Sequence, residues 1–150
     1  MAQLLDKASS KLGLTFPNPV TAAAVVKDNT IISWGVHQGV GQDHAEVVAL
    51  KAAGELARGA DIFVNLEPCT HTGRTPPCTE AIIQAGIKRV VYAVDDPNPS
   101  VRRLPAKAVL AEHGITVDSG LMEMAALELN EVFFKTTTSN YPFVCLKIGL

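Results

Sequence analysis

The chain has 150 residues, the length of one domain, and 47% of them are hydrophobic, which is enough for a packed core. Its formal net charge is −2, and its basic residues are scattered except at Lys88-Arg89 and Arg102-Arg103. This argues against a nucleic-acid surface, which gathers basic side chains on one face. No apolar run approaches the ~18 residues of a membrane span, and the N-terminus lacks a signal-peptide core. We expect a soluble, cytoplasmic protein that binds neither nucleic acid nor membrane.

The apolar pattern predicts helices and strands in alternation. The expected helices are 2–12, 44–58, 78–85, about 105–112 and 121–134, and the expected strands are 20–26, 31–36, 60–66, 89–94, 115–118 and 141–148. The turn "KDNT" joins the first two strands into a hairpin, whereas helices connect the later strands, which are then largely parallel. Cys145 lies in the last apolar strand, so we expect it in the core. The sequence thus predicts an α/β fold, with a mixed sheet of about five strands and helices on both faces.

Residues suited to metal binding lie in two short stretches, "DHAEVVAL" and "EPCTHTGRTPPC". His44, Cys69 and Cys78 offer the imidazole nitrogen and thiolate sulfur that zinc prefers, and three protein ligands leave one tetrahedral position for water. Cys78 opens an expected helix, where the helix dipole favours a thiolate, and Cys69 follows a strand end. Three cysteines cannot all pair, which favours metal binding over a disulfide framework.

Glu46 has two possible roles. With Asp43 as the N-cap of the helix, Glu46 stands where a capping-box acid belongs. His44 and Glu46 also form H-x-E, the first half of a zinc deaminase signature, in which the acid moves protons between water, ring nitrogen and leaving amine. Both can face one site only from the opening turn of the helix, because residues two apart otherwise point to nearly opposite sides. A closed structural zinc site with His71 as fourth ligand is a further alternative.

The strings "HAEVVAL", "LEPCTHTGRTPPCTEAI" and "DDPNP", with "TFPNPV" near the start, resemble the deaminase domain of the bifunctional riboflavin-biosynthesis deaminase/reductase over nearly the whole chain. The resemblance implies a cytidine deaminase-like three-layer α/β/α sandwich. It also implies zinc held by His44, Cys69 and Cys78, with Glu46 as the catalytic proton shuttle. The implied reaction is hydrolytic deamination of 2,5-diamino-6-(5-phosphoribosylamino)pyrimidin-4(3H)-one to 5-amino-6-(5-phosphoribosylamino)uracil.

The resemblance further implies a set of substrate contacts. Asn18 matches an asparagine that contacts the pyrimidine, and a cation at Arg74 suits the ribose phosphate. The residues expected to bind substrate are Asn18, His37, His71, Arg74, Asp96 and Asn98. From the residues alone, Asp96 and Asn98 are also common turn formers, Arg74 suits a solvated loop and His37 suits surface packing.

Two stretches depart from the family pattern on the substrate side. After "DPNP" the family carries V-x-G-x-G, where this chain has "SVRRLPAK", and Thr21 and Ala22 replace a valine and a glycine. Deamination of another aminated pyrimidine, purine or pterin-like ring therefore remains an alternative, as does a non-catalytic, zinc-stapled binding module.

The terminal "YPFVCLKIGL" resembles the first strand of the family's reductase domain. We expect a deaminase domain over residues 1–141 and the start of a truncated or absent reductase domain over residues 142–150, with no NADPH reduction by this chain. The expected partners are the small phosphoribosylated pyrimidine, a reductase domain or separate reductase, and further copies of the chain.

Overall fold

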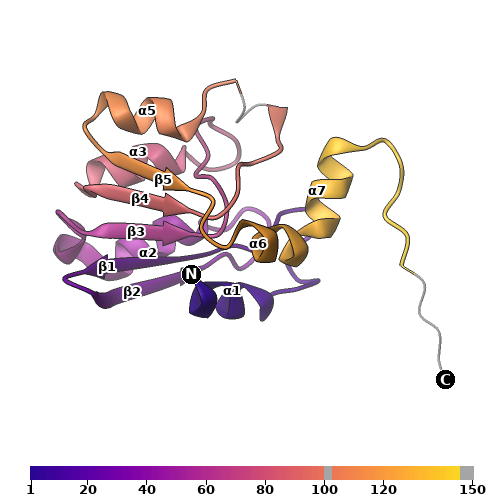
Figure 1. Cartoon of the computed structure of the whole chain (residues 1–150), viewed down its shortest axis with the longest axis horizontal. Helices are drawn as coiled ribbons and strands as arrows, with labels where there is room; N and C mark the ends of the chain where they lie inside the picture. Colours follow the sequence, from indigo (N-terminus) through magenta and orange to yellow (C-terminus); the bar gives the residue numbers. More distant parts are fainter. Residues whose placement is uncertain (100–102, 146–150) are drawn as a thin grey trace.

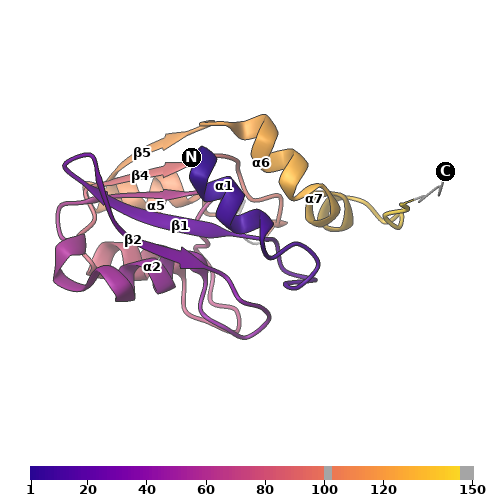
Figure 2. The same ribbon diagram turned by 90° about the horizontal axis from the view of Figure 1, so that it is seen from below.

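The chain folds into three layers, with a mixed five-stranded sheet between two sets of helices (Figure 1, Figure 2). The structure is a computed structural model that describes residues 1–99 and 103–145. The strands are β1 (Ala22–Lys27), β2 (Thr30–Val36), β3 (Asp61–Val64), β4 (Arg89–Tyr92) and β5 (Thr116–Ser119). The helices are α1 (Ala2–Ser9), α2 (Ala45–Ala53), the 3₁₀ helix η1 (Gly54–Ala57), α3 (Cys78–Gln84), α5 (Ala106–Glu112), α6 (Glu123–Leu129) and α7 (Glu131–Thr138). None of the helices described has the length and hydrophobicity to cross a membrane.

The strand order is β2-β1-β3-β4-β5. β1 pairs antiparallel with both β2 and β3, whereas β4 and β5 continue the sheet in parallel. The hairpin turns at Asp28 and Asn29, whose φ angles of 50° and 59° are those that a tight two-residue turn requires and that Asp and Asn tolerate. The predicted hairpin, the parallel later strands and the mixed sheet are confirmed.

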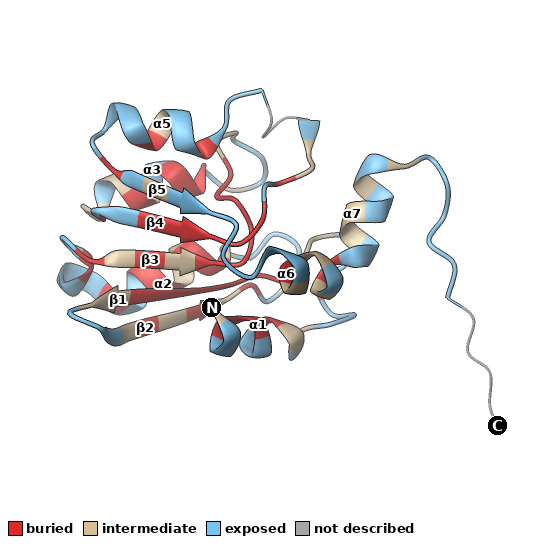
Figure 3. Ribbon diagram, viewed as in Figure 1, coloured by how far each residue is buried: buried red, intermediate tan, exposed pale blue. Residues whose placement is uncertain are grey.

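Alternate residues of β1 pack against the helices on the two faces of the sheet. Ala23 and Val25 belong to the core that α2, α3 and α5 form with the sheet. Ala22 and Ala24 face the other way and pack against α1, because successive strand side chains point to opposite faces. Figure 3 shows the buried positions concentrated on the inner strands and on the helix faces turned toward them. Both faces of the sheet are therefore covered, as the sequence predicts.

α2 packs against β2 without an intervening side chain at Gly35. A Cβ on Gly35 would lie 2.0 Å from the carbonyl oxygen of Ala45 and 2.5 Å from the backbone nitrogen of Ala49. Only glycine leaves room for this contact. Because Ala45 is the first residue of α2, the contact fixes the start of the helix that carries His44 and Glu46.

The register of the sheet brings four chain segments to one edge. Ala22 pairs with Val36, Ala23 with Val64, and Val64 with Tyr92. The segment that enters β1 therefore meets the segments that leave β2, β3 and β4. In open α/β sheets, ligands bind at this edge, beyond the carboxyl ends of the parallel strands.

The predicted helix 44–58 is shorter and changes type. α2 ends at Ala53, and Gly54, with φ of 54°, begins the 3₁₀ helix η1. The left-handed backbone at Gly54 interrupts the helical winding, and beyond it Ala57 lies in the core whereas Leu56 is 58% exposed. The apolar pattern over 44–58 predicts that Leu56 faces the core. This prediction is wrong, because the helical period does not persist past Ala53.

The predicted helix 121–134 is two helices, α6 and α7, that meet at Asn130. The buried Asn130 side chain accepts a hydrogen bond from the Val20 amide at 2.8 Å and donates one to the Val20 carbonyl at 3.0 Å. Leu121 and Met124, two of the apolar residues of the predicted helix, are 44% and 77% exposed. Local periodicity does not reveal this break, because the partner of Asn130 lies 110 residues away.

The predicted strand 141–148 is wrong over its described residues, 141–145, where the backbone forms no strand. This segment leaves the body of the protein after α7 (Figure 1), and no strand in the described part of the chain pairs with it. Tyr141 and Val144 are 77% and 80% exposed, and Cys145 is exposed rather than in the core. Residues 146–148 lie outside the described residues, and the expected boundary at residue 141 remains a prediction.

We predict that Gly35→Ala lowers the free energy of unfolding by at least about 2 kcal/mol, because the added methyl group meets the Ala45 and Ala49 backbone. Urea denaturation measures the change. Gly73→Ala is the matched control, since its Cβ would have His71 Nε2, at 3.9 Å, as nearest neighbour. The control should stay within about 0.5 kcal/mol of the native chain. Equal stability of both variants would contradict the packing account.

Candidate active site

Three potential metal ligands converge at this edge of the sheet. His44 immediately precedes α2, Cys69 lies in the loop after β3, and Cys78 is the first residue of α3. Their ligand atoms all lie within 4.8 Å of one another. His44 Nδ1 is 3.1 Å from Cys78 Sγ and 3.6 Å from Cys69 Sγ. One imidazole and two thiolates suit zinc, and three ligands leave a position for water.

The orientation of the His44 ring identifies its ligand atom. Nδ1 faces the two sulfurs, whereas Nε2 lies 3.4 Å from Thr75 Oγ1 on the other side of the ring. A hydrogen bond from Nε2–H to Thr75 leaves the lone pair on Nδ1, the arrangement by which a neighbour fixes the tautomer of a metal-binding histidine. Thr75 is therefore the residue that orients the His44 ring toward the two sulfurs.

Backbone groups at the start of α3 hold the Cys69 loop. The Cys78 amide donates to Cys69 Sγ at 3.3 Å, and the Thr79 amide and hydroxyl donate to the Cys69 carbonyl at 3.2 and 3.3 Å. The hydrogen bond from the Cys78 thiol is the main reason that the pKa of Cys69 falls to about 4. The same bond and burial raise the pKa of Cys78. The pair thus holds a thiolate at neutral pH, the form that binds metal.

Glu46 lies beside this group and is only 4% exposed. Burial, followed by the negative charge of Cys69, raises the pKa of Glu46 to about 7, which lets the carboxyl accept and release protons near neutral pH. The expected Asp43 N-cap is wrong: His44 is the N-cap, no side chain caps α2, and the Asp43 carboxylate pairs with exposed Lys51. Glu46 nonetheless stands in the opening turn, the position from which it and His44 can face one site.

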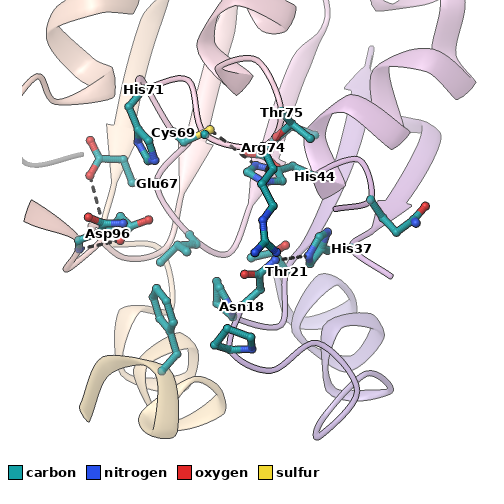
Figure 4. A pocket seen from close by; sticks show the side chains of 18 of the residues that line it. Asn18, Thr21, His37, His44, Glu67, Cys69, His71, Arg74, Thr75 and Asp96 are labelled. Atoms are coloured by element: carbon teal, nitrogen blue, oxygen red, sulfur yellow. Dashed lines mark hydrogen bonds between the residues drawn. The ribbon is translucent and has the colours of Figure 1, made fainter. Parts of the chain in front are cut away.

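A pocket of about 390 Å³ opens over these groups, and His44, Glu46 and Cys69 belong to its wall. Its volume suits a small-molecule ligand. Figure 4 shows Glu67, His71 and Asp96 on one side of the pocket and His37 on the other, with Arg74 and Asn18 between them. All six expected substrate residues line this pocket: Asn18, His37, His71, Arg74, Asp96 and Asn98.

Asn18 and His37 form a pair whose donor and acceptor roles follow from the backbone. His37 Nδ1 is 3.0 Å from the Asp43 carbonyl, which only accepts, so Nδ1 carries the proton. Nε2 then accepts from Asn18 Nδ2 at 2.9 Å (Figure 4). Burial lowers the pKa of His37, in keeping with the neutral ring. Asn18 therefore presents its Oδ1 as the hydrogen-bond acceptor for a ligand.

Asp96 and Asn98 combine the two roles that the sequence left open. Asp96 Oδ1 accepts the Asn98 amide at 2.8 Å, so the two residues do form a turn. Both also line the pocket. Burial is the main reason that the pKa of Asp96 rises to about 6.

His71 does not belong to the metal group, which consists of His44, Cys69 and Cys78 among the described residues. The closed structural site with His71 as fourth ligand therefore lacks support. His71 lines the pocket, and its buried Nδ1 has no hydrogen-bond partner within the described part of the chain. Arg74 is exposed at the same pocket, where a cation is accessible to an anionic ligand.

Sequence reasoning missed Glu67, Thr75 and Phe133, which also line the pocket. Glu67 and Thr75 lie inside the cysteine string, so their proximity to the ligands was the available signal. Phe133 gave no such signal. It reaches the pocket because the break at Asn130 turns α7 toward the segment that enters β1.

The fold and the site define a zinc-binding α/β protein of the deaminase class. Residues 1–94 match the cytidine and deoxycytidylate deaminase zinc-binding region. The chain belongs to this family, and its cofactor is zinc.

Relatives and solved structures are similar over nearly the whole chain. The riboflavin biosynthesis protein RibD of Aquifex aeolicus is 51% identical over 98% of this chain and 41% of its own length. The structure of Acinetobacter baumannii RibD, form 2, has a TM-score of 0.88 at 43% identity, over 95% of this chain and 40% of that one. A Thermotoga maritima diaminohydroxyphosphoribosylaminopyrimidine deaminase/5-amino-6-(5-phosphoribosylamino)uracil reductase has a TM-score of 0.86 at 42% identity, over 92% and 40%. The chain thus spans about two fifths of these relatives.

We predict that the native chain carries about one zinc ion and that Cys69→Ser loses it. Loss of a residue that only hydrogen-bonds to a metal ligand lowers metal affinity by roughly 10- to 100-fold. Loss of a ligand itself should lower the affinity by more. Elemental analysis after dialysis measures the bound zinc. Cys145→Ser, at an exposed cysteine outside the metal group, is the control and should retain zinc. Native zinc content in Cys69→Ser would contradict the ligand assignment.

Proposed function

We propose that the chain catalyses the hydrolytic deamination of 2,5-diamino-6-(5-phosphoribosylamino)pyrimidin-4(3H)-one to 5-amino-6-(5-phosphoribosylamino)uracil in riboflavin biosynthesis. The buried Glu46 beside the group of His44, Cys69 and Cys78, at a pocket of small-molecule size, is the observation that carries the proposal. The names of the relatives support the substrate, because one of them is a deaminase of this phosphoribosylated pyrimidine.

In the proposed reaction, His44, Cys69 and Cys78 hold zinc, which when bound supplies Lewis-acid activation of a water molecule. Glu46 accepts the proton that the attacking water gives up and delivers it to the adjacent ring nitrogen. The water oxygen bonds to the ring carbon that carries the 2-amino group. Glu46 then takes the remaining proton from the oxygen that came from water and passes it to the amine; the carbon–nitrogen bond breaks, and ammonia leaves as the carbon becomes a carbonyl.

Asn18 and His37 have the geometry to orient the pyrimidine. The Asn18 Oδ1 is a hydrogen-bond acceptor, because the amide nitrogen donates to His37. An acceptor suits a substrate ring that carries amino and N–H donors. His37 is a positioning residue in this account, since its hydrogen bonds to the Asp43 carbonyl and to Asn18 fix the direction of the amide.

The remaining residues of the pocket suit the ribose and phosphate. Arg74 offers an accessible guanidinium, which pairs with phosphate through two parallel hydrogen bonds. Asp96 and Asn98 offer acceptors and donors for the ribose hydroxyls, and the buried His71 Nδ1 has no partner among the residues that the structure describes.

The second candidate is a deaminase of another aminated pyrimidine, purine or pterin-like ring. Its support is the stretch "SVRRLPAK", which replaces the family's glycines on the substrate side and of which residues 100–102 lie outside the described residues. The non-catalytic module has less support, because a binding module has no use for a buried carboxyl beside the metal group.

The proposed product still has to be reduced, and the Thermotoga maritima relative is named as both deaminase and reductase. A reductase, as a further domain after residue 141 or as a separate protein, is thus the proposed partner. We also propose that the chain is cytoplasmic, assembles into homo-oligomers and does not bind nucleic acid.

We predict that Glu46→Gln lowers kcat for ammonia release by about 10²- to 10⁴-fold, the usual contribution of a positioned acid-base group. Glutamine keeps the size of the side chain but cannot carry a proton, and zinc content should not change. Glu80→Gln, on the exposed surface of α3, makes the same change away from the pocket and should keep native kcat.

The comparison of substrates separates the two candidates. The phosphoribosylated diaminopyrimidine, its dephosphorylated form, cytidine, guanine and a pterin are assayed for ammonia release under the same conditions. The highest kcat/KM should belong to the phosphoribosylated compound. Faster turnover of another ring would favour the second candidate, and native activity in Glu46→Gln would exclude Glu46 as the proton shuttle.

A further inference from the structure

We propose that Glu67 is a positioning residue for substrate binding, whose buried carboxylate holds the segment with Asp96 and Asn98 at the pocket. The inference rests on the proposed function, because it assigns Glu67 the task of keeping the ribose side of the pocket at a fixed place relative to the metal group.

The Glu67 carboxylate binds both ends of the connection between β4 and α5. Its Oε2 accepts the Asp96 amide at 3.2 Å, and its Oε1 accepts the Ala106 amide at 2.8 Å (Figure 4 shows the contact with Asp96). Glu67 is 5% exposed, so these hydrogen bonds are shielded from water. A single side chain after β3 thus holds this connection at Asp96, shortly after it leaves the sheet, and again at the start of α5.

The Ala106 amide needs this partner. Ala106 is the first residue of α5, and Pro105 before it is an N-cap that provides no side-chain hydrogen bond. The first amides of a helix have no acceptor within the helix, and leaving one buried and unpaired is costly. Glu67 supplies the acceptor from a neighbouring loop.

Two further hydrogen bonds join the same loops. The Glu67 amide donates to the Val94 carbonyl at 2.9 Å, and Thr70 Oγ1 donates to the Leu104 carbonyl at 2.7 Å. Because Cys69 lies between Glu67 and Thr70, the segment that carries a metal ligand and the segment that carries Asp96 are linked on both sides of that ligand. The geometry points to one unit that sets the distance from metal group to ribose.

A role for Glu67 in the metal group itself is less consistent with its contacts. It stands two residues before Cys69, yet it is not a member of the group of close ligand atoms. Its two oxygens each face a backbone amide of the connection after β4. Glu67 thus acts through Asp96 and Asn98 rather than on the reacting atoms.

We predict that Glu67→Gln raises KM for the phosphoribosylated pyrimidine by about 10- to 100-fold, the value of a hydrogen bond to a charged group. The new amide nitrogen would face a backbone N–H, donor against donor. We expect kcat within about threefold and zinc content unchanged, because the metal group and Glu46 stay intact. Amide hydrogen exchange at Ala106 should become faster. Glu80→Gln is the matched control and should change none of these quantities.

Thr70→Val keeps the test decisive if Glu67→Gln does not fold. It removes only the hydrogen bond to the Leu104 carbonyl and should raise KM in the same direction by a few-fold. A native KM in a folded Glu67→Gln, or in Thr70→Val where the first variant is unfolded, would overturn the inference. Loss of zinc or a fall in kcat without a change in KM would also overturn it, since Glu67 would then serve the metal group.

Failure of the proposed function has a different signature, namely no ammonia release by the native chain. The inference is then judged on affinity for ribose 5-phosphate, measured by calorimetry on the native chain and on Glu67→Gln. A drop of about tenfold or more in the variant would support the positioning role for the ribose side. Equal affinities, or no binding by the native chain, would overturn it.

Discussion

The contact of the His44 imidazole with the Cys69 and Cys78 sulfurs is the interaction on which the rest of the site depends. It joins the start of α2, the loop after β3 and the start of α3, segments separated by up to 34 residues. The contact requires α2 to lie close against β2, which Gly35 permits. Shifting α2 outward by the width of a methyl group would withdraw both His44 and Glu46 from the cysteines.

Buried acids give the site its chemistry and would destabilise the fold without partners. Glu46 is buried beside the metal group, and the resulting rise in its pKa to about 7 suits proton transfer. Glu67 is buried too, and its two oxygens accept hydrogen bonds from the Asp96 and Ala106 amides. One carboxyl therefore remains able to exchange protons, while the other holds backbone.

Much of the fold and of the metal group was predictable because both depend on short-range patterns. Short apolar runs that end in turn residues indicated the strands, and His44, Cys69 and Cys78 have the imidazole and thiolate groups that zinc prefers. The break at Asn130 was not predictable in this way, because the hydrogen bonds that stabilise it go to Val20. Tertiary hydrogen bonds of this kind have no local signature.

The remaining errors have equally specific causes. Asp43 has the residue type of an N-cap, but the helix begins one residue later and Asp43 instead pairs with Lys51. Leu56 lost its expected burial where α2 passes into the 3₁₀ helix. Cys145 lies in an apolar stretch that no strand in the described part of the chain accompanies. An apolar pattern indicates what a segment can bury, not whether a neighbour is present to bury it.

The most direct test of the account is ammonia release from the phosphoribosylated diaminopyrimidine as a function of bound zinc. The chain is depleted with a chelator and titrated back with zinc. The account predicts no turnover by the depleted chain and a linear recovery that ends at about one zinc per chain, since a single His/Cys/Cys group holds the metal among the described residues. Full activity without zinc, or no ammonia release by the zinc-loaded chain, would contradict it.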